Sequence, residues 1–439
     1  MSEILKKNQI VYTEISKLSC EINEFLGGGG QGEVYKAILN GKEIALKWYY
    51  PASATIDQKI ALETLIKKGA PNEKFLWPIE LVSESNLKGF GYIMPLREKR
   101  FGNIVDLMKR RISPTLKVLT TVGLELANNF FQLHSKGLCY RDISFGNAFF
   151  DPNTGEVLIC DNDNVAIDGE SKIGVLGTPR FMSPEVVRGE SKPNTYTDLF
   201  SLAVLLFYIL TTSHPLEGKK ESEIKCLDLP AMTKLYGTNP IFVYDPNDQT
   251  NRPLSGYHDN VIAFWNIYPI FLKNLFIKSF TEGIKDPING RVRESEWRSA
   301  MVTLRDSIIY CQCGAENFYD VDTLKIDNNS ILKCWDCNKN LILPPRIKIG
   351  RNIIMLNHDT KLFPHHIDDH KLYDFSSPVA EISRNPNNPN LWGLKNLSIE
   401  KWVLKSSEGI LKDVEPNKSV PIINGNKISF GKIDGEIRA

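Results

Sequence analysis

The sequence predicts an α+β fold in which a β-rich lobe and a helical lobe are followed by a small cysteine module and an antiparallel β-sandwich. Two strand-like runs flank a glycine-rich turn near the start, and helical patterns follow in residues 57–68, 199–210 and 296–310. After residue 346 the pattern changes to short β-rich runs separated by Asn, Asp, Gly and Pro. We therefore expect an N-terminal extension (1–20), a two-lobed domain (21–308, with lobes 21–95 and 96–308), a cysteine module (309–343) and a sandwich (346–439).

The composition is that of a globular protein, with 42% hydrophobic and 24% charged residues. Lys and Arg number 53 against 52 Asp and Glu, a formal net charge of +1, so we expect neither nucleic acid nor a membrane as a partner. The longest strongly apolar run, Leu199 to Leu210, is too short to span a bilayer. The first ten residues lack the apolar stretch of a signal peptide, so we expect a cytoplasmic location.

The glycine-rich turn has the spacing of a phosphate-binding loop. Gly27, Gly29 and Gly32 fit G-x-G-x-x-G, and Val34 is the apolar residue two positions later. Glycine suits this position because the backbone must approach phosphate oxygens closely. The Walker sequence is excluded because Glu33, and not lysine, follows the last glycine. The two strand-like flanks favour this interpretation over a flexible linker.

A lysine and a helix carboxylate follow the turn in the order that nucleotide phosphates require. The strand-like run 43–47 ends in Lys47, which we expect to hold the α- and β-phosphates. The helical pattern 57–68 offers Glu63 as the carboxylate that would hold Lys47. Taken alone, both would be surface residues. Their place between the glycine turn and the segment described next favours the functional interpretation.

The segment 133–150 resembles the catalytic loop of eukaryotic-like (Hanks-type) protein kinases, H-R-D-L-x-x-x-N. Asp142 and Asn147 match, whereas Tyr140 replaces the His. The resemblance implies a bilobal protein-kinase fold, ATP and Mg²⁺ as cofactors, and a protein substrate. It also implies that Asp142 orients the substrate hydroxyl and that Asn147 binds magnesium. Ser144 stands where most Ser/Thr kinases carry lysine, so turnover is slow or the charge comes from elsewhere.

Two further segments fit the same resemblance. Asp161 ends an apolar strand and fits the magnesium-binding Asp of D-F-G, with Asn162 and Asp163 in place of Phe and Gly. We interpret Asp163 as a turn residue at the strand end rather than a further metal ligand. The apolar run 89–98 suits the hinge between two lobes. The expected adenine contacts are Leu26, Val34, Ala45, Met94, Pro95 and Leu96, for all of which core packing is the alternative.

The segment 177–185, GTPRFMSPE, resembles the end of a protein-kinase activation segment. Small-molecule phosphotransferases lack it, which argues against a small-molecule kinase, and Thr178 implies Ser/Thr specificity. The resemblance also implies that Asp198 anchors the catalytic loop and that Arg291 pairs with Glu185. Ser171 and Thr178 are the available hydroxyls for autophosphorylation, because Arg141 beside the catalytic Asp could pair with a new phosphate.

The eight cysteines form two populations. Four are scattered (Cys20, Cys139, Cys160 and Cys226), and four form two close pairs separated by twenty residues (Cys311, Cys313, Cys334 and Cys337). Two such pairs suit tetrahedral coordination of a structural Zn²⁺ in a zinc ribbon. Disulfides are the alternative, and a reducing cytosol disfavours them.

The C-terminal part resembles a forkhead-associated sandwich at residues 349–351, 394–398 and 423–431. Arg351 is the candidate phosphothreonine ligand, but the Ser-x-x-His element of that family has no counterpart here. A sandwich for docking or support is therefore the alternative. We expect the histidines His365, His366 and His370 to be solvated rather than metal ligands.

The chain also resembles the bacterial stress-associated kinases of the TerY phosphorylation triads, in Tyr-Arg-Asp (140–142), Asp-Asn-Asp (161–163), an HPLEG stretch (214–218) and a cysteine module after the kinase. That resemblance implies stress signalling, with a von Willebrand factor A protein and a metal-dependent protein phosphatase as partners. The main rival to an active enzyme is a pseudokinase that binds ATP and docks partner proteins. Tyr140, Ser144 and Asn162 favour that rival, and the retained phosphate, metal and hydroxyl ligands count against it.

Overall fold

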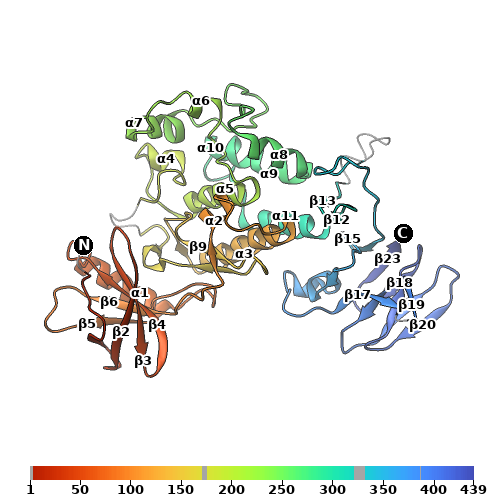
Figure 1. The fold of residues 1–439 in the computed structure, drawn as a ribbon, viewed down its shortest axis with the longest axis horizontal. Helices are drawn as coiled ribbons and strands as arrows, with labels where there is room; N and C mark the ends of the chain where they lie inside the picture. Colours follow the sequence, from red (N-terminus) through yellow and green to blue (C-terminus); the bar gives the residue numbers. More distant parts are fainter. Residues whose placement is uncertain (1–2, 171–175, 321–331, 386) are drawn as a thin grey trace. The chain divides into compact units, whose positions relative to one another are not determined.

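The computed structural model describes residues 3–170, 176–320, 332–385 and 387–439 (Figure 1). The chain divides into two compact units. The first unit holds Met1–Asn266 and Lys273–Arg298, and the second holds Ile267–Leu272 and Ser299–Ala439.

The first unit begins with a closed antiparallel barrel in the order β1-β2-β3-β4-β6-β5. Its strands are β1 (Ile10–Thr13), β2 (Ser19–Gly28), β3 (Gly32–Leu39), β4 (Lys42–Tyr49), β5 (Glu80–Ser83) and β6 (Gly91–Met94). The predicted strand pair around the glycine turn is confirmed as β2 and β3. A Cβ on Gly32 would lie 2.2 Å from the Trp48 carbonyl oxygen, so close strand packing requires glycine there.

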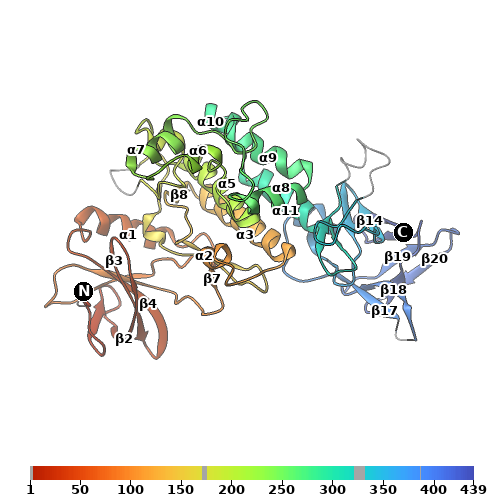
Figure 2. The same cartoon turned by 45° about the horizontal axis from the view of Figure 1, so that its top comes forward.

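Helix α1 (Ile56–Lys68) lies beside the barrel strands, as Figures 1 and 2 both show. The Thr55 side chain caps its N-terminus by accepting a hydrogen bond from Gln58 N, and Gly69 at φ 71° ends it. Leu62 and Leu65 are the buried residues of this helix. They define the side of α1 that packs inward.

The helical lobe is built around α3 (Leu116–Ser135) and α5 (Thr195–Thr211). Fifteen of the α5 residues are buried, because this predicted apolar helix runs through the centre of the lobe. An Asn194 capping box starts it, and Thr212 in the left-handed conformation ends it. Among the described residues, no helix combines the length and the apolar character needed to cross a membrane.

Short elements complete the helical part of the chain. The helices are α2 (Ile104–Met108), α4 (Pro184–Val187), α6 (Lys219–Ser222), α7 (Leu229–Met232), η2 (Thr233–Thr238), α8 (Asp259–Ile267), α9 (Ile270–Phe280), α10 (Glu282–Lys285) and α11 (Glu294–Asp306). The strands are β7 (Gly102–Asn103), β8 (Leu138–Cys139), β9 (Ala148–Phe150), β10 (Val157–Ile159) and β11 (Ala166–Ile167), with a 3₁₀ turn, η1 (Asn162–Asn164), between the last two.

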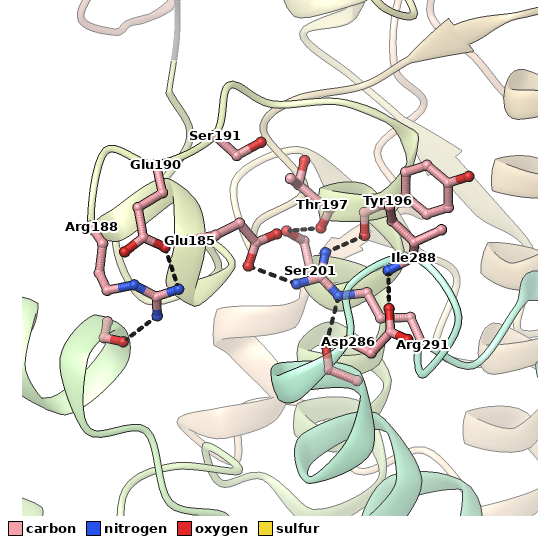
Figure 3. A network of polar contacts seen from close by, with 12 residues as sticks. Glu185, Arg188, Glu190, Ser191, Tyr196, Thr197, Ser201, Asp286, Ile288 and Arg291 are labelled. Atoms are coloured by element: carbon pink, nitrogen blue, oxygen red, sulfur yellow. Dashed lines mark hydrogen bonds and ion pairs between the residues drawn. The ribbon is translucent and has the colours of Figure 1, made fainter.

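A buried ion pair joins two distant parts of the helical lobe (Figure 3). Arg291 Nη2 donates to Glu185 Oε2 at 2.8 Å, and the two side chains are 1% and 11% exposed. Arg291 also donates to the carbonyl oxygens of Tyr196 and Gly283. The guanidinium thereby fastens α4 to the start of α5 and to α10.

We expect Arg291→Ala to lower the free energy of unfolding of the chain by about 3–5 kcal/mol, because it leaves the Glu185 carboxylate buried without its counter-charge. Urea unfolding monitored by tryptophan fluorescence measures the loss. The control is Arg111→Ala, which removes an exposed pair with Asp106 and should cost less than about 1 kcal/mol. Equal losses in the two variants would contradict the assignment.

The second unit contains a hairpin of β12 (Ile308–Tyr310) and β13 (Glu316–Phe318). A predicted sandwich of two antiparallel sheets follows, in the orders β15-β14-β23-β22-β19-β20 and β16-β17-β18-β21. Side chains from both sheets, among them Ile347, Leu394 and Trp402, share one buried core. The elements are β14 (Arg346–Ile349), β15 (Asn352–Met355), β16 (Lys361–Leu362), α13 (Pro364–Ile367), η3 (Asp369–Lys371), β17 (Ala380–Asn385), β18 (Asn388–Asn396), β19 (Trp402–Lys405), β20 (Leu411–Val414), β21 (Ser419–Pro421), β22 (Lys427–Ser429) and β23 (Asp434–Arg438).

Candidate active site

The loop that follows β8 is held in place by one buried carboxylate. Asp198 on α5 accepts hydrogen bonds from the backbone N–H groups of Tyr140 at 2.5 Å and Arg141 at 3.0 Å. His134 Nε2 lies 3.2 Å from the same carboxylate, and its Nδ1 contacts Glu294. Burial alone would lower the pKa of His134, but hydrogen bonds to Asp198 and Glu294 outweigh it and raise the pKa to about 9. A charged imidazolium therefore balances the carboxylate that holds the loop.

Tyr140 ties this loop to the strand that precedes Asp161. Its ring is fully buried and packs edge-on against Phe130, with 5.6 Å between the ring centroids. Its hydroxyl donates to the backbone carbonyl of Cys160. The residue that departs from the usual His thus connects the loop that holds Asp142 to the segment that holds Asp161.

Asp142 and Asn147 lie in direct contact. Asn147 Nδ2 donates to Asp142 Oδ2 at 3.1 Å and to the Asp142 carbonyl at 2.8 Å. Thr178 Oγ1 donates to the other carboxylate oxygen, Oδ1, at 2.9 Å. Burial raises the pKa of Asp142, although these hydrogen bonds oppose the rise. The carboxylate is therefore held in one orientation by a neighbouring amide and by the activation segment.

Lys47 on β4 reaches the segment that follows β10. Its Nζ lies 3.5 Å from Asp161 Oδ1 and 2.8 Å from Asp163 Oδ2, and its side chain is 7% exposed. Asp161 adopts the left-handed conformation, φ 47°, and its side chain is 42% exposed. Three separate segments thus contribute to this site: β4 with Lys47, the loop that holds both Asp142 and Asn147, and the segment after β10 with Asp161. The exposed carboxylate of Asp161 is open to a bound group.

The prediction that Glu63 pairs with Lys47 is wrong for this structure. Leu62 and Leu65 set the inward face of α1, and Glu63 is exposed on another side of the helix. A polar residue of α1 near Lys47 is Gln58, whose Nε2 donates to Tyr49 Oη at 3.1 Å. An apolar pattern at helical spacing indicates a helix, but it does not say which polar residue borders the inward face.

Asp163 and Tyr49 both lie beside Lys47, and neither contact was predicted from the sequence. Asp163 lies in the turn η1 after β10, as expected, but it is only 2% exposed and accepts hydrogen bonds from Lys47 and from Tyr49 Oη. Two signals were present: an acidic residue where related sequences have glycine, and a tyrosine two positions after Lys47, on the same face of β4.

Asn162, in the place of the usual Phe, is a second buried polar residue of this segment. It is 0% exposed, and its Nδ2 donates to the carbonyl oxygens of Leu76 and Ile159, both at 2.9 Å. Hydrogen bonds to the backbone thus replace apolar packing at this position.

Four of the six expected adenine contacts lie in one apolar cluster. Ala45 and Met94 are paired across β4 and β6 and buried, and Val34 and Leu96 pack against the same cluster. Leu26 and Pro95 are exposed. A Cβ on Gly27 or Gly29 would have no atom within 4 Å, so the glycine turn leaves open space beside it, as a loop over a ligand requires.

A model of the protein kinase domain matches residues 20–265, which is more than half of the chain. The chain belongs to the protein kinase family. It is 25% identical to a probable LIM domain-containing serine/threonine-protein kinase of Dictyostelium discoideum, over 50% of this chain and 34% of that protein. It is 30% identical to the cell cycle serine/threonine-protein kinase CDC5/MSD2 of Saccharomyces cerevisiae, over 46% of this chain and 30% of that kinase.

A bacterial relative is the DNA damage-responsive serine/threonine-protein kinase RqkA of Deinococcus radiodurans, 28% identical over 46% of this chain and 31% of that kinase. The kinase chain described here therefore spans about a third of the length of each of these three relatives. The residues matched by the family model, 20–265, lie within the first unit, which carries the site above.

Beyond the matched domain of this kinase, four cysteine sulfurs converge. The Sγ atoms of Cys311, Cys313, Cys334 and Cys337 all lie within 4.8 Å of one another. The closest pairs, Cys311–Cys337 and Cys313–Cys334, are 3.6 and 3.7 Å apart. Zn–S bonds of about 2.3 Å in a tetrahedron place sulfurs about 3.8 Å apart, so the cluster fits zinc. A disulfide needs about 2.05 Å, so these thiols are free.

Arg351 is exposed in the tight turn between β14 and β15. The prediction of solvated histidines is wrong for His365 and His366, which are 7% and 3% exposed; His366 Nε2 lies 3.3 Å from Asp306. Ser171 lies outside the described residues.

Proposed function

We propose that this chain is an active Ser/Thr protein kinase, which transfers the γ-phosphate of ATP to protein hydroxyls. The observation that carries the proposal is that Asp142, Asn147 and Thr178 form one hydrogen-bonded group, and Lys47 lies within ion-pair distance of Asp161. These are the residues that the reaction requires, and they come from segments far apart in the sequence. Catalysis of this kind is mainly positioning and charge neutralisation.

Each residue has a defined task in this proposal. Lys47 would hold the α- and β-phosphates, and Asp161 and Asn147 would hold magnesium, which neutralises phosphate charge. The contacts of Asn147 to Asp142 both use Nδ2, which leaves Oδ1 as the metal-binding atom. Asp142 would orient the acceptor hydroxyl and take its proton, and the raised pKa of this carboxyl makes it a better proton acceptor.

The residues that differ from the kinase pattern, and so favour a pseudokinase, make structural contacts within the site. Tyr140 bonds to the Cys160 carbonyl, and Asn162 bonds to two backbone carbonyls, so both hold the segments that carry Asp142 and Asp161. Ser144 is 7% exposed and adds no charge beside the γ-phosphate, so we expect slower turnover than in kinases with lysine there. These observations favour the enzyme over the scaffold.

The test is transfer of radiolabel from ATP to a generic protein acceptor, followed by analysis of the labelled amino acids. We expect Mg²⁺-dependent label in phosphoserine and phosphothreonine, and none with Asp161→Asn, which removes the exposed metal carboxylate. Label confined to phosphotyrosine, or transfer that persists at full rate in the variant, would contradict the proposal.

We also propose autophosphorylation at Ser171. The other candidate, Thr178, donates its hydroxyl to Asp142, so a phosphate there would remove a contact of the catalytic carboxylate. Mass spectrometry of the same reaction without acceptor checks this site. An unmodified segment 161–185 after incubation with ATP would count against it.

The second unit is proposed to bind a structural Zn²⁺ through its four cysteines and to dock partner proteins through its sandwich. Arg351 is accessible in its turn, which supports a weak phosphothreonine contact there. Cytoplasmic stress signalling, with a von Willebrand factor A protein and a metal-dependent protein phosphatase as partners, rests on the resemblance to the TerY group. The relative that responds to DNA damage supports a role in signalling, but it does not support these particular partners.

A further inference from the structure

We propose that Asp163, held by Tyr49, is the carboxylate that positions Lys47, in place of a glutamate on helix α1. The inference rests on the proposed kinase function, because it concerns how the phosphate-binding lysine is oriented. Asp163 is a positioning residue in this proposal, since it acts through Lys47.

The first argument is the burial of the charge. The Lys47 side chain is 7% exposed and that of Asp163 is 0% exposed, and Nζ lies 3.1 Å from Oδ1 and 2.8 Å from Oδ2. A buried ammonium requires a buried counter-charge at hydrogen-bond distance. Asp161 is farther away, at 3.5 Å, and 42% exposed, so it is the weaker of the two partners. Asp163 is therefore the main counter-ion of Lys47.

The second argument is that Asp163 is itself held in place. Tyr49 Oη donates to Asp163 Oδ2 at 2.5 Å, and Tyr49 lies on the same face of β4 as Lys47 because the two are two positions apart. The rings of Phe90 and Tyr92 pack against Tyr49, with centroids 5.3 and 6.1 Å away. Strand β4 thus supplies both the lysine and the phenol that fixes the lysine's partner.

The third argument concerns helix α1. Gln58 accompanies Leu62 and Leu65 on the inward face, and its Nε2 lies 3.1 Å from Tyr49 Oη and 3.4 Å from the Asp163 carbonyl. Glu63 is five residues farther on, about 140° around the helix, and exposed. Helix α1 therefore presents an amide where a carboxylate would be needed.

A metal-binding role for Asp163 fits less well. Both of its carboxylate oxygens accept hydrogen bonds from Lys47 or Tyr49, and the side chain has no exposed surface. Asp161, two residues earlier, has the exposed carboxylate. The two aspartates of this segment thus have different roles in the proposal: Asp161 would hold the metal, and Asp163 holds the lysine.

The test compares Asp163→Asn with the matched variant Glu63→Gln, with kcat and KM for ATP measured separately and Mg-ATP binding measured by calorimetry. We expect Asp163→Asn to lower kcat/KM for ATP by about 100-fold, because the lysine loses its orientation, and to weaken Mg-ATP binding. Glu63→Gln should change neither quantity by more than about twofold. A larger loss of kcat/KM and of Mg-ATP affinity in Glu63→Gln than in Asp163→Asn would overturn the proposal.

A double-mutant cycle with Lys47→Met separates positioning from a general loss of structure. In the Lys47→Met background, Asp163→Asn should produce no further loss of Mg-ATP affinity or turnover, because the residue through which it acts is gone. If the double variant instead loses affinity or turnover by the product of the two single-variant factors, the proposal is overturned. Tyr49→Phe removes one hydroxyl and keeps the ring, so this variant replaces Asp163→Asn if the latter does not fold. We expect it to lower kcat/KM for ATP several-fold. Unchanged kinetics would count against the proposal.

The calorimetric measurement of Mg-ATP binding keeps the enzyme proposal and the positioning proposal distinguishable. If the wild-type chain binds Mg-ATP but transfers no phosphate, the enzyme proposal fails, while the ranking of the two variants in Mg-ATP affinity still decides the role of Asp163. If the wild-type chain transfers phosphate and Asp163→Asn does so equally well, only the positioning proposal fails.

Discussion

Asp142→Asn is expected to lower kcat by about 10²–10⁴-fold, while the affinity for Mg-ATP stays within about twofold. The asparagine keeps an oxygen that can accept the Thr178 hydroxyl, so the loop and the activation segment stay connected. What the substitution removes is the group that accepts the proton of the substrate hydroxyl. Binding and turnover should therefore separate, which an ATP-binding scaffold would not show.

Single-turnover transfer from labelled ATP measures the effect of Asp142→Asn without interference from product release. Asp106→Asn makes the same chemical change at an aspartate whose described partner is the exposed Arg111, and should leave kcat within about twofold. Turnover of Asp142→Asn within threefold of wild type would show that another group accepts the proton.

Removing zinc is expected to unfold the cysteine segment of the second unit. Structural zinc contributes about 10–16 kcal/mol to the folding of small zinc-binding peptides, far more than the short hairpin of β12 and β13 could supply. We expect one zinc per chain in the purified protein. Cys334→Ser should lower that content to near zero and remove the hydrogen-exchange protection of the amides around the cluster.

The matched control for the zinc prediction is Cys226→Ser. Cys226 is an exposed thiol in the first unit and lies outside the four-sulfur cluster, so its replacement should leave the zinc content unchanged. A wild-type chain without metal, or a Cys334→Ser protein with full zinc, would contradict the assignment.

The features that could be predicted from the sequence are those encoded within short segments. Asp142 and Asn147 are five residues apart, and their contact follows from the loop that contains both. The strands on either side of the glycine turn pair with each other, as local alternation and a tight turn dictate. The pair of Glu185 and Arg291 spans 106 residues and could be named only through the family resemblance.

The errors arise where a polar side chain enters the interior. Glu63 was assigned from the helical pattern alone and is exposed, and the burial of the turn residue Asp163 was not predicted. His365 and His366 were expected to be solvated, yet both are buried. A periodic apolar pattern shows which side of an element faces the core, but the partner of a buried polar group comes from a distant segment that the pattern does not contain.

The two amide hydrogen bonds of Asn162 bear on how inhibitors could distinguish this kinase. In kinases with the D-F-G sequence, the packing of the phenylalanine at this position sets the active and inactive states. Here an outward swing would break two buried bonds to the carbonyl oxygens of Leu76 and Ile159, and would leave behind a polar-walled gap. Compounds that place an apolar group in the space of the phenylalanine should therefore bind this chain weakly. Ligands that contact only the adenine walls should still bind.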